Sequence, residues 1–372
     1  MSKNHESFAA IVPRITGSIS VVSSSLLIYL IYRSKPKLST IYNRIMFCMS
    51  VADILASTAI ALTTLPMPRD DDPYWEGVDL SIEDNSWSGQ TKLGTRQTCA
   101  AQGFFYSSGI VIMFCYNGNL CIYYACAIAF RMKEAQIRKK IEPVIHGGPL
   151  FLGLYTAIPY FMGGIYNPSP QDSWCIPYPP YTTPEARVLI GRATFVNIGV
   201  LFLVILICFA LIIWRVVQNG RQLAHADSRG DIQIDERFKA AHRNTRLIIL
   251  QSLAYTGALF LTLIFLFARN MLTQTTSIGD FDPITIWISS LMSIFLPLQG
   301  FFNFTIFLWH KGKLLSHVSF IGNSHGCFIN SRDFSQLRII DLQTLLSVSF
   351  TSFAFYSRLL PKNRFCYQDC PC

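Results

Sequence analysis

Apolar residues are concentrated in seven long stretches, and polar residues fill the gaps between them. The stretches cover roughly 11–32, 43–65, 98–130, 146–166, 191–217, 245–268 and 283–309. A helix needs about 20 mostly apolar residues to cross the hydrocarbon core of a bilayer, where its backbone groups must be bonded internally. Core helices of soluble proteins are usually shorter and carry polar stripes. The pattern therefore predicts an all-α membrane protein, a bundle of seven transmembrane helices.

Proline positions refine the ends of these helices. Pro13 suits the first turn of a helix, so the first helix is expected to begin there. Pro66 and Pro68 are expected to end the second helix near residue 65. Pro297 lies inside the last stretch, where it frees a carbonyl group and predicts a kink about one turn before Asn303.

Composition agrees with a single membrane domain. The chain has 372 residues, of which 51% are hydrophobic and 14% charged, whereas soluble domains average about 25% charged residues. We expect a short extracellular segment at 1–10, the seven-helix domain at 11–310, and a poorly ordered cytosolic tail at 311–372.

Basic residues are unevenly distributed among the gaps. The gaps after the first, third and fifth stretches hold twice as many Lys and Arg residues as the opposite side. The positive-inside rule then places the N-terminus outside and the C-terminus in the cytosol. This distribution explains most of the net charge of +9 by topology and contact with anionic membrane lipids, and argues against nucleic acid as a partner.

Two cysteines differ from those within the helices. Cys99 precedes the third helix on the exterior side, and Cys175 lies in the Pro- and Tyr-rich second exterior loop, which is expected to form a stiff lid. Disulfides persist on the oxidising side of the membrane, and a bridge here would tie the lid to the bundle. Two free surface thiols are the alternative.

Asp53 is a carboxylate near the middle of the second helix. A charge at this depth is costly and needs polar partners. The last helix offers Gln299 and Asn303 on one face, and the third helix offers Asn117. Asn119 and Ser23–Ser25 are further candidates. We expect an intramembrane polar network that either changes between two helix arrangements, with room for a sodium ion or a proton, or statically holds the helices together.

Several phrases resemble the seven-transmembrane G protein-coupled receptors. They are Ser50–Asp53, the Cys99 and Cys175 pair, Leu298–Asn303, Thr64–Pro66 and Ala101–Phe105. The Leu-Gln-Gly-Phe phrase is similar to the secretin and cyclic-AMP-receptor-like branch, in particular to its protist members. The resemblance covers about residues 10–312. It departs from rhodopsin-like receptors in lacking Asp/Glu-Arg-Tyr in the third helix, Asn-Pro-x-x-Tyr in the seventh and the Trp switch in the sixth.

The resemblance implies a receptor in the plasma membrane that binds a small extracellular ligand and signals to a cytosolic heterotrimeric G protein. Candidate ligand residues near the exterior helix ends are Gln102, Tyr106, Trp174, Arg192 and Trp287. Basic residues at the cytosolic helix ends are candidates for the G protein face, and each also fits a role as a topology anchor: Arg131, Arg243, Arg246 and Lys311.

Other functions for a seven-helix bundle fit less well. A retinal Schiff base needs a lysine within a helix, and none of the seven stretches contains one. A small-solute transporter or channel remains the alternative, although one buried acid and a few amides make a thin polar path. The stretches hold no metal-binding cluster and no Ser/His/Asp set, so neither an enzyme nor a cofactor is expected.

Overall fold

The computed structural model describes residues 3–69, 71–72, 91–168, 172–177, 196, 199–215, 217–218, 236–275 and 283–324. Within these, side chains are described except at 3–9, 236–248, 270, 273–275, 283 and 312–324. The chain divides into two units, Met1–Lys311 and Gly312–Cys372. The sites discussed for Asp53, for the lid and for the helix ends predicted to face the cytosol all lie in the first unit.

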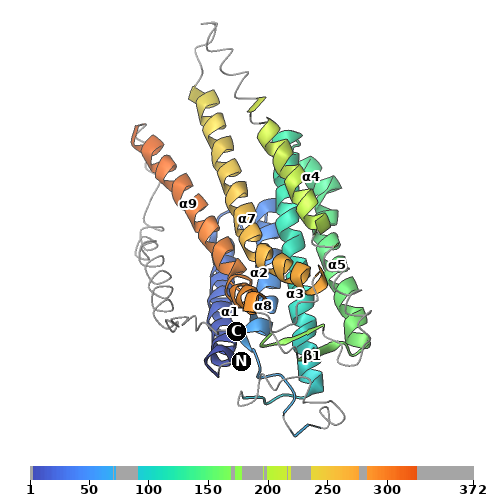
Figure 1. Ribbon diagram of the computed structural model, residues 1–372. Helices are drawn as coiled ribbons and strands as arrows, with labels where there is room; N and C mark the ends of the chain where they lie inside the picture. The colour runs from blue at the N-terminus through green and yellow to red at the C-terminus, as the bar shows by residue number, and fades with distance from the viewer. Residues whose placement is uncertain are drawn as a thin grey trace, which may run out of the picture. The chain divides into compact units, whose positions relative to one another are not determined.

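The described part of the chain is mainly helical (Figure 1). In chain order the elements are α1 (Lys3–Arg33), α2 (Ile41–Ala61), α3 (Arg96–Tyr124), a π-helical turn (Ala125–Ala129), α4 (Glu134–Lys140), α5 (Glu142–Met162), β1 (Tyr166–Pro168), β2 (Cys175–Pro177), a helix at Gly199–Arg215, α7 (Glu236–Thr275), α8 (Pro283–Phe295) and α9 (Gln299–Ser324). Each of the seven apolar stretches therefore contains a helix.

Several of these helices are long and apolar enough to cross a membrane. Within the described residues four single helices meet that criterion, in α1, α2, α3 with its π-helical turn, and α7. A fifth span is formed if α8 and α9 are counted together. The two other stretches contain α5 and the shorter apolar helix Gly199–Arg215. The expected all-α membrane bundle is confirmed.

Helix α3 has packed neighbours on several sides. It contacts α2, α5, α7 and both strands, and α1 packs against α2 and α8. Glycines allow the close approaches: a Cβ on Gly17 would lie 2.9 Å from the carbonyl oxygen of Ser57, and one on Gly109 would lie 2.9 Å from the amide nitrogen of Ala56. Such contacts between small residues suit helix packing in lipid.

Helix ends differ from the prediction in three places. Helix α1 begins at Lys3 and contains Pro13, because no other helix breaker precedes this proline and a proline removes only one backbone hydrogen bond. Helix α2 ends at Ala61, and the turn after it places Thr63 at a positive φ of 47°. The expected kink near Pro297 is a break between α8 and α9 with a bend of 45°.

The loop after α5 contains a short hairpin. Strand β1 pairs antiparallel with β2, with Tyr166 opposite Pro177 and Pro168 opposite Cys175. Both strands contact α3. Strand β1 begins at Tyr166, so the sequence prediction carried the fourth helix too far, past the C-cap residue Gly163.

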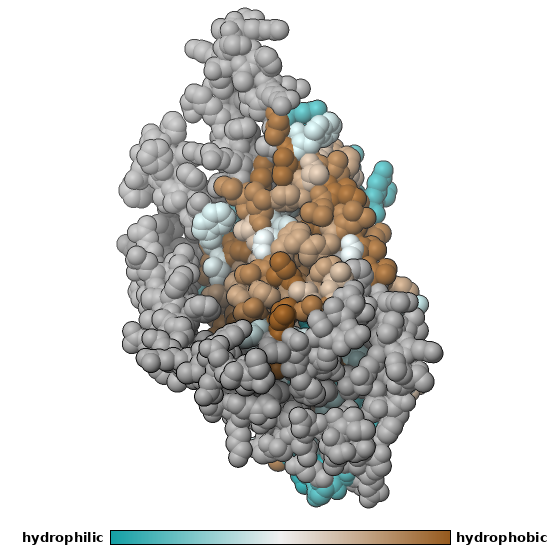
Figure 2. Space-filling model, viewed as in Figure 1, coloured by the Kyte–Doolittle hydropathy of each residue, from teal (hydrophilic) through white to brown (hydrophobic). Residues whose placement is uncertain are grey.

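Apolar side chains cover most of the coloured surface of the helices in Figure 2, and hydrophilic ones lie at its margins. On α5, Phe151 and Tyr155 are both 66% exposed, which fits contact with lipid tails. The buried core in turn contains polar side chains, among them Asp53, Gln102, Asn117 and Gln299. Buried polar groups need partners, and those partners define the candidate sites.

Candidate functional site

Asp53 is fully buried on α2 and accepts hydrogen bonds from three serines. Ser24 Oγ lies 2.6 Å and Ser20 Oγ 3.1 Å from Asp53 Oδ2. Both serines belong to α1 and are four residues apart, so they project from one helix face. Ser57 Oγ, on α2 itself, lies 3.5 Å from Oδ1. Hydroxyl donors of this kind stabilise a carboxylate that is removed from water.

The N-terminus of α9 lies against the same carboxylate. The backbone nitrogen of Gly300 donates to Ser20 Oγ at 3.0 Å. A Cβ at position 300 would lie 2.0 Å from Asp53 Oδ2 and 2.2 Å from Ser24 Oγ, so only glycine fits there. The first amides of a helix lack intrahelical acceptors and carry a partial positive charge. The break at Pro297 thus presents a helix N-terminus to the buried carboxylate Asp53.

Three of the amides suggested as partners of Asp53 make other hydrogen bonds. Gln299 Nε2 donates to Asn303 Oδ1 at 3.2 Å, and Gln299 Oε1 accepts from Thr262 Oγ1 of α7 at 3.0 Å. Asn117 Nδ2 donates to the carbonyl oxygen of Met113 in its own helix. Asn303 Nδ2 is buried without a hydrogen-bond partner among the described residues. Gln299 therefore links α9 to α7, and Asn303 bonds to Gln299 within α9.

Sequence reasoning missed Ser20 and Ser57 as partners of Asp53. The sequence suggested Ser23–Ser25 as partners on the first helix, and the structure uses Ser24 with Ser20. The spacing of four residues between Ser20 and Ser24 was a usable signal, because residues at that spacing share a helix face.

A second polar cluster joins α2 and α7 at the end of the bundle predicted to face the cytosol. Tyr42 Oη accepts from Gln251 Nε2 at 2.6 Å and lies 3.2 Å from Tyr255 Oη. The Tyr42 ring stacks on Phe307 of α9, with ring centroids 6.5 Å apart and an interplanar angle of 7°. We call Tyr42, Gln251 and Tyr255 the tyrosine latch. The three side chains are neutral and largely buried.

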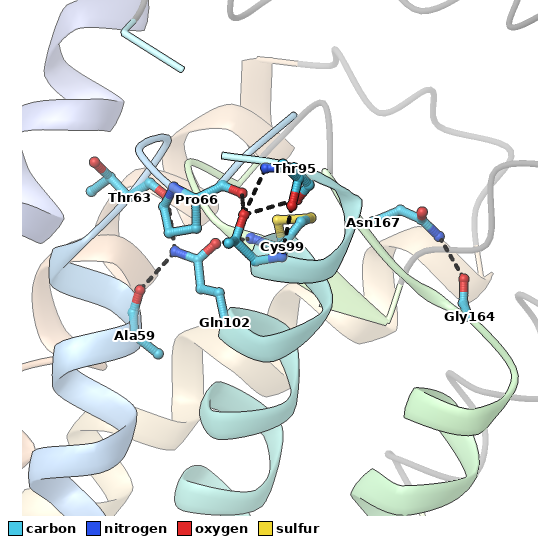
Figure 3. The surroundings of a disulfide bond; sticks show 10 residues. Ala59, Thr63, Pro66, Thr95, Cys99, Gln102, Gly164 and Asn167 are labelled. Carbon is cyan, nitrogen blue, oxygen red and sulfur yellow. Dashed lines mark hydrogen bonds between the residues drawn. A yellow bond between two sulfur atoms is a disulfide. The ribbon is translucent and has the colours of Figure 1, made fainter. Parts of the chain in front are cut away.

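At the end of the bundle predicted to face the exterior, a disulfide between Cys99 and Cys175 joins α3 to the lid, the loop that contains β1 and β2 (Figure 3). Beside it, Gln102 Nε2 donates to the carbonyl oxygens of Ala59 and Thr63, both at 2.8 Å. Gln102 Oε1 accepts from the backbone nitrogen of Cys175 at 3.1 Å. The hydrogen bonds of this side chain thus join α2, α3 and the lid.

The lid is also joined to α7 by an ion pair. Arg269 Nη1 and Nη2 each lie 2.8 Å from one carboxylate oxygen of Asp172. Trp174 packs against Tyr106 of α3, with ring centroids 5.8 Å apart. Asp172, Ser173, Trp174 and Cys175 are each no more than 1% exposed. We call Asp172–Cys175 the plug.

The ligand residues suggested by sequence have different environments. Tyr106 and Trp174 are in contact, and Gln102 is buried beside Cys175. Trp287 on α8 is 61% exposed and is placed as a membrane-facing side chain would be. Arg192 lies outside the described residues. Asp172 and Arg269 were not suggested as ligand residues, although an acid inside the lid and an arginine at a helix end are visible in the sequence.

The basic residues suggested for the G protein face lie on three elements. Arg131 follows the π-helical turn and has a positive φ of 51°. Lys311 Nζ lies 5.2 Å from the ring centroid of Phe307. Arg243 and Arg246 belong to α7, but their side chains are outside the described set.

Metal ligands do not cluster in the part of the chain that the structure describes. No group of three or more His, Cys, Asp or Glu residues there is arranged to hold a metal ion. The candidate sites are the buried carboxylate of Asp53, the tyrosine latch, and the lid that is bonded to α3 through Cys99 and Cys175. Together they are suited to holding helices in one arrangement.

Comparisons with known proteins identify the fold. No family model matches the chain, and no curated protein matches it in sequence. Among the solved structures that match is the crystal structure of squid rhodopsin, with a TM-score of 0.59 over 91% of each chain at 13% sequence identity. The fold is that of rhodopsin. A match at this identity defines the rhodopsin-like fold alone and carries no ligand or partner with it.

Proposed function

We propose that this chain is a G protein-coupled receptor in the plasma membrane that binds a small extracellular ligand and signals to a heterotrimeric G protein. The rhodopsin-like fold over 91% of the chain is the observation that carries the proposal. In the proposed orientation the N-terminus and the lid are outside, and the tyrosine latch faces the cytosol. The phrase Leu298–Phe301 supports the finer assignment to the cyclic-AMP-receptor-like branch.

Helix α7 is the proposed moving element. It packs against α3 and α8, and its described polar contacts include the tyrosine latch, the hydrogen bonds of Thr256 with Cys121 and of Thr262 with Gln299, and the ion pair between Arg269 and Asp172. A ligand that binds one arrangement of α7 more tightly than another would shift the population toward it. A G protein would then bind the cytosolic face that the shift opens, with the basic residues Arg131, Arg243, Arg246 and Lys311 as candidate contacts.

A light-sensing function is not part of the proposal. Retinal in a Schiff base needs a lysine amine within the bundle, and none of the seven apolar stretches contains lysine. A chain with a rhodopsin-like fold but without that amine is better suited to a diffusible ligand.

The test is a G protein dissociation assay in cells that express the chain, screened with nucleotides, amines, sugars, carboxylates and lipids. We expect at least one compound to give concentration-dependent dissociation that is absent from untransfected cells. An ion-flux measurement in the same cells is the control. Flux without G protein dissociation would favour a transporter or channel and contradict the proposal.

The variant Asp53→Asn tests the buried site in the same assay. The amide keeps the size of the side chain but removes the charge that faces Ser20, Ser24 and the start of α9. We expect basal G protein activity to change while surface expression stays near that of the wild type. Loss of surface expression together with loss of signal would instead show that the site is a structural support.

A further inference from the structure

Two segments that are far apart in the sequence form one surface at the end of the bundle predicted to face the cytosol. They are the loop 34–40, which joins α1 to α2, and the helix α4. Glu134 Oε1 of α4 accepts a hydrogen bond from the backbone nitrogen of Ile41 at 3.2 Å, and Arg138 Nη2 donates to the carbonyl oxygen of Ser39 at 3.3 Å. These hydrogen bonds place the loop beside α4.

Helix α4 turns its charged side chains outward. Ile137 is 1% exposed, whereas the residues on either side of it, 133–136 and 138–140, are all exposed. Together α4, the residue before it and the loop 34–40 carry six exposed basic side chains, which we call the basic patch: Lys35, Lys37, Lys133, Arg138, Lys139 and Lys140.

The acidic residues next to the basic patch are engaged by other groups. Glu142 Oε1 is ion-paired with Arg44, and Glu142 Oε2 lies 3.9 Å from Arg138 Nε. Glu134 accepts from the backbone of Ile41. Four lysines of the patch form no ion pair among the residues that the structure describes: Lys35, Lys37, Lys139 and Lys140. The patch therefore keeps an excess of positive charge, which attracts anions.

The basic patch adjoins the side of the bundle that faces lipid. The loop 34–40 directly follows Arg33, the last residue of α1, and one residue separates α4 from α5. Phe130, which follows the π-helical turn, is 61% exposed, and Val144 in the first turn of α5 is 69% exposed, as apolar side chains in contact with lipid are. Basic groups directly beside the ends of membrane spans lie at the level of the lipid headgroups.

We propose that the basic patch binds the headgroup of an anionic membrane lipid that carries phosphate monoesters, of the phosphorylated inositol class. Clusters of about four to eight Lys and Arg residues immediately beside a membrane span are typical of sites for such headgroups. A headgroup with several phosphates can contact the loop 34–40 and α4 at once, whereas phosphatidylserine brings a single net negative charge. The site goes beyond the proposed function, since none of its six residues is a candidate for the G protein face.

A lipid bound there would also stabilise the position of α2. The loop 34–40 leads directly into α2, and α4 holds the first residue of that helix through Glu134. Tyr42 of the tyrosine latch is the second residue of α2. A headgroup that bridges the loop and α4 therefore supports the helix end that carries the latch.

The test is a binding assay with the purified full-length chain in detergent. The probe is fluorescently labelled phosphatidylinositol bisphosphate, and its anisotropy is followed as the chain is added. We expect saturable binding that the unlabelled lipid competes away. Phosphatidylserine at equal total charge should compete at least about tenfold less well, and equal competition would overturn the preference for phosphate monoesters.

The soluble compound inositol trisphosphate separates a lipid site from a site for a free phosphate compound. It carries the phosphates but no acyl chains, so it should compete at least about tenfold less well than the unlabelled lipid. Equal competition would assign the basic patch to a soluble phosphate compound and overturn the proposal of a lipid.

The variant Lys139→Gln/Lys140→Gln tests the residues. It should weaken binding about tenfold or more, because each basic residue near an anionic surface contributes about fivefold to affinity. Lys139→Arg/Lys140→Arg keeps both charges and is the matched control, and Arg96→Gln removes an exposed charge from the start of α3. Both should bind as the wild type does.

Equal affinity of Lys139→Gln/Lys140→Gln and the wild type, or no saturable binding by the wild type, would overturn the proposal. If this variant does not fold, Lys35→Gln/Lys37→Gln serves in its place, with the same expected loss. The assay contains no G protein. Lipid binding without G protein dissociation in cells would thus support the lipid site and contradict the receptor function, and the reverse result would do the opposite.

Discussion

At the residue scale, Gly300 sets how closely α9 can approach α2. Its backbone lies beside Asp53, Ser20 and Ser24, and any side chain would overlap all three. Helix propensity alone would favour alanine over glycine by about 1 kcal/mol. The overlap reverses this preference, because Asp53, Ser20 and Ser24 are buried and both serines are hydrogen-bonded to Asp53.

We therefore expect Gly300→Ala to lower the free energy of unfolding by about 1–3 kcal/mol, the usual cost of overpacking a core. Thermal unfolding of the purified variant measures this. Gly257→Ala in α7 is the matched control, since a Cβ there has nothing within 4 Å, and it should leave stability unchanged or raise it by up to about 1 kcal/mol. A neutral result for Gly300→Ala would contradict the close contact.

The sequence indicated which types of residue form the buried site around Asp53. It did not indicate which of them donate hydrogen bonds to Asp53. The depth of Asp53 and its need for donors follow from its place in an apolar stretch. The actual donors depend on how α1 is rotated against α2, and Gly17 helps to set that rotation by contact with Ser57. Gln299 and Asn303 can donate hydrogen bonds and were therefore suggested as partners of Asp53. In the structure Gln299 bonds instead to Thr262 and to Asn303.

At the element scale, the tyrosine latch is the tie that holds α7 to α2. Tyr42 Oη accepts from Gln251 and contacts Tyr255, so one hydroxyl serves two residues of α7. Each such hydrogen bond contributes about 0.5–1.5 kcal/mol, and a buried amide left without its acceptor adds a further cost. Loss of these hydrogen bonds therefore raises the free energy of the arrangement in which α7 contacts α2. It does not affect an arrangement in which α7 has already moved away.

We expect Tyr42→Phe to raise basal G protein activity, with about a fivefold shift in population for each kcal/mol lost. Spin labels at the ends of α2 and α7 nearest the tyrosine latch should show a larger population at long distance, and this measurement does not depend on the G protein. Tyr155→Phe, at an exposed tyrosine of α5, is the control and should match the wild type. An unchanged distance distribution in Tyr42→Phe would show that the latch does not restrain α7.

Hydropathy located the helices better than it located their ends. Each apolar stretch holds a helix because a membrane span has few alternatives. The break after Phe295 could be predicted from Pro297, a local signal. The pairing of Tyr166–Pro168 with Cys175–Pro177 could not be predicted from the sequence. It depends on contact of both strands with α3 and on the disulfide between Cys175 and Cys99.

At the scale of the whole molecule, the disulfide joins parts of the chain separated by 76 residues. A cross-link over a loop of this length typically stabilises the folded state by about 2–4 kcal/mol, mainly by restricting the unfolded chain. It also keeps the plug next to α3, where Cys175 bonds to Gln102.

Cys175→Ala should lower the free energy of unfolding by about that amount and impair the response to ligand, because the plug loses its fixed end. Thermal unfolding with and without reductant measures the first effect, and reduced wild type should resemble the variant. Cys115→Ala removes a free, half-buried thiol and is the control. A variant that keeps the wild-type Tm and response would contradict this role of the bridge.

The glycine contacts imply that backbone amide hydrogens exchange more slowly in α1, α2 and α3 than in α7. On α1 and α3, a Cβ at Gly17 or Gly109 would lie 2.9 Å from a backbone atom of α2, whereas one at Gly199 or Gly257 would meet nothing within 4 Å. Helices in backbone contact must separate before their amides open, while helices held apart by side chains can open locally. Deuterium uptake should therefore be slow in α1, α2 and α3 and faster in α7.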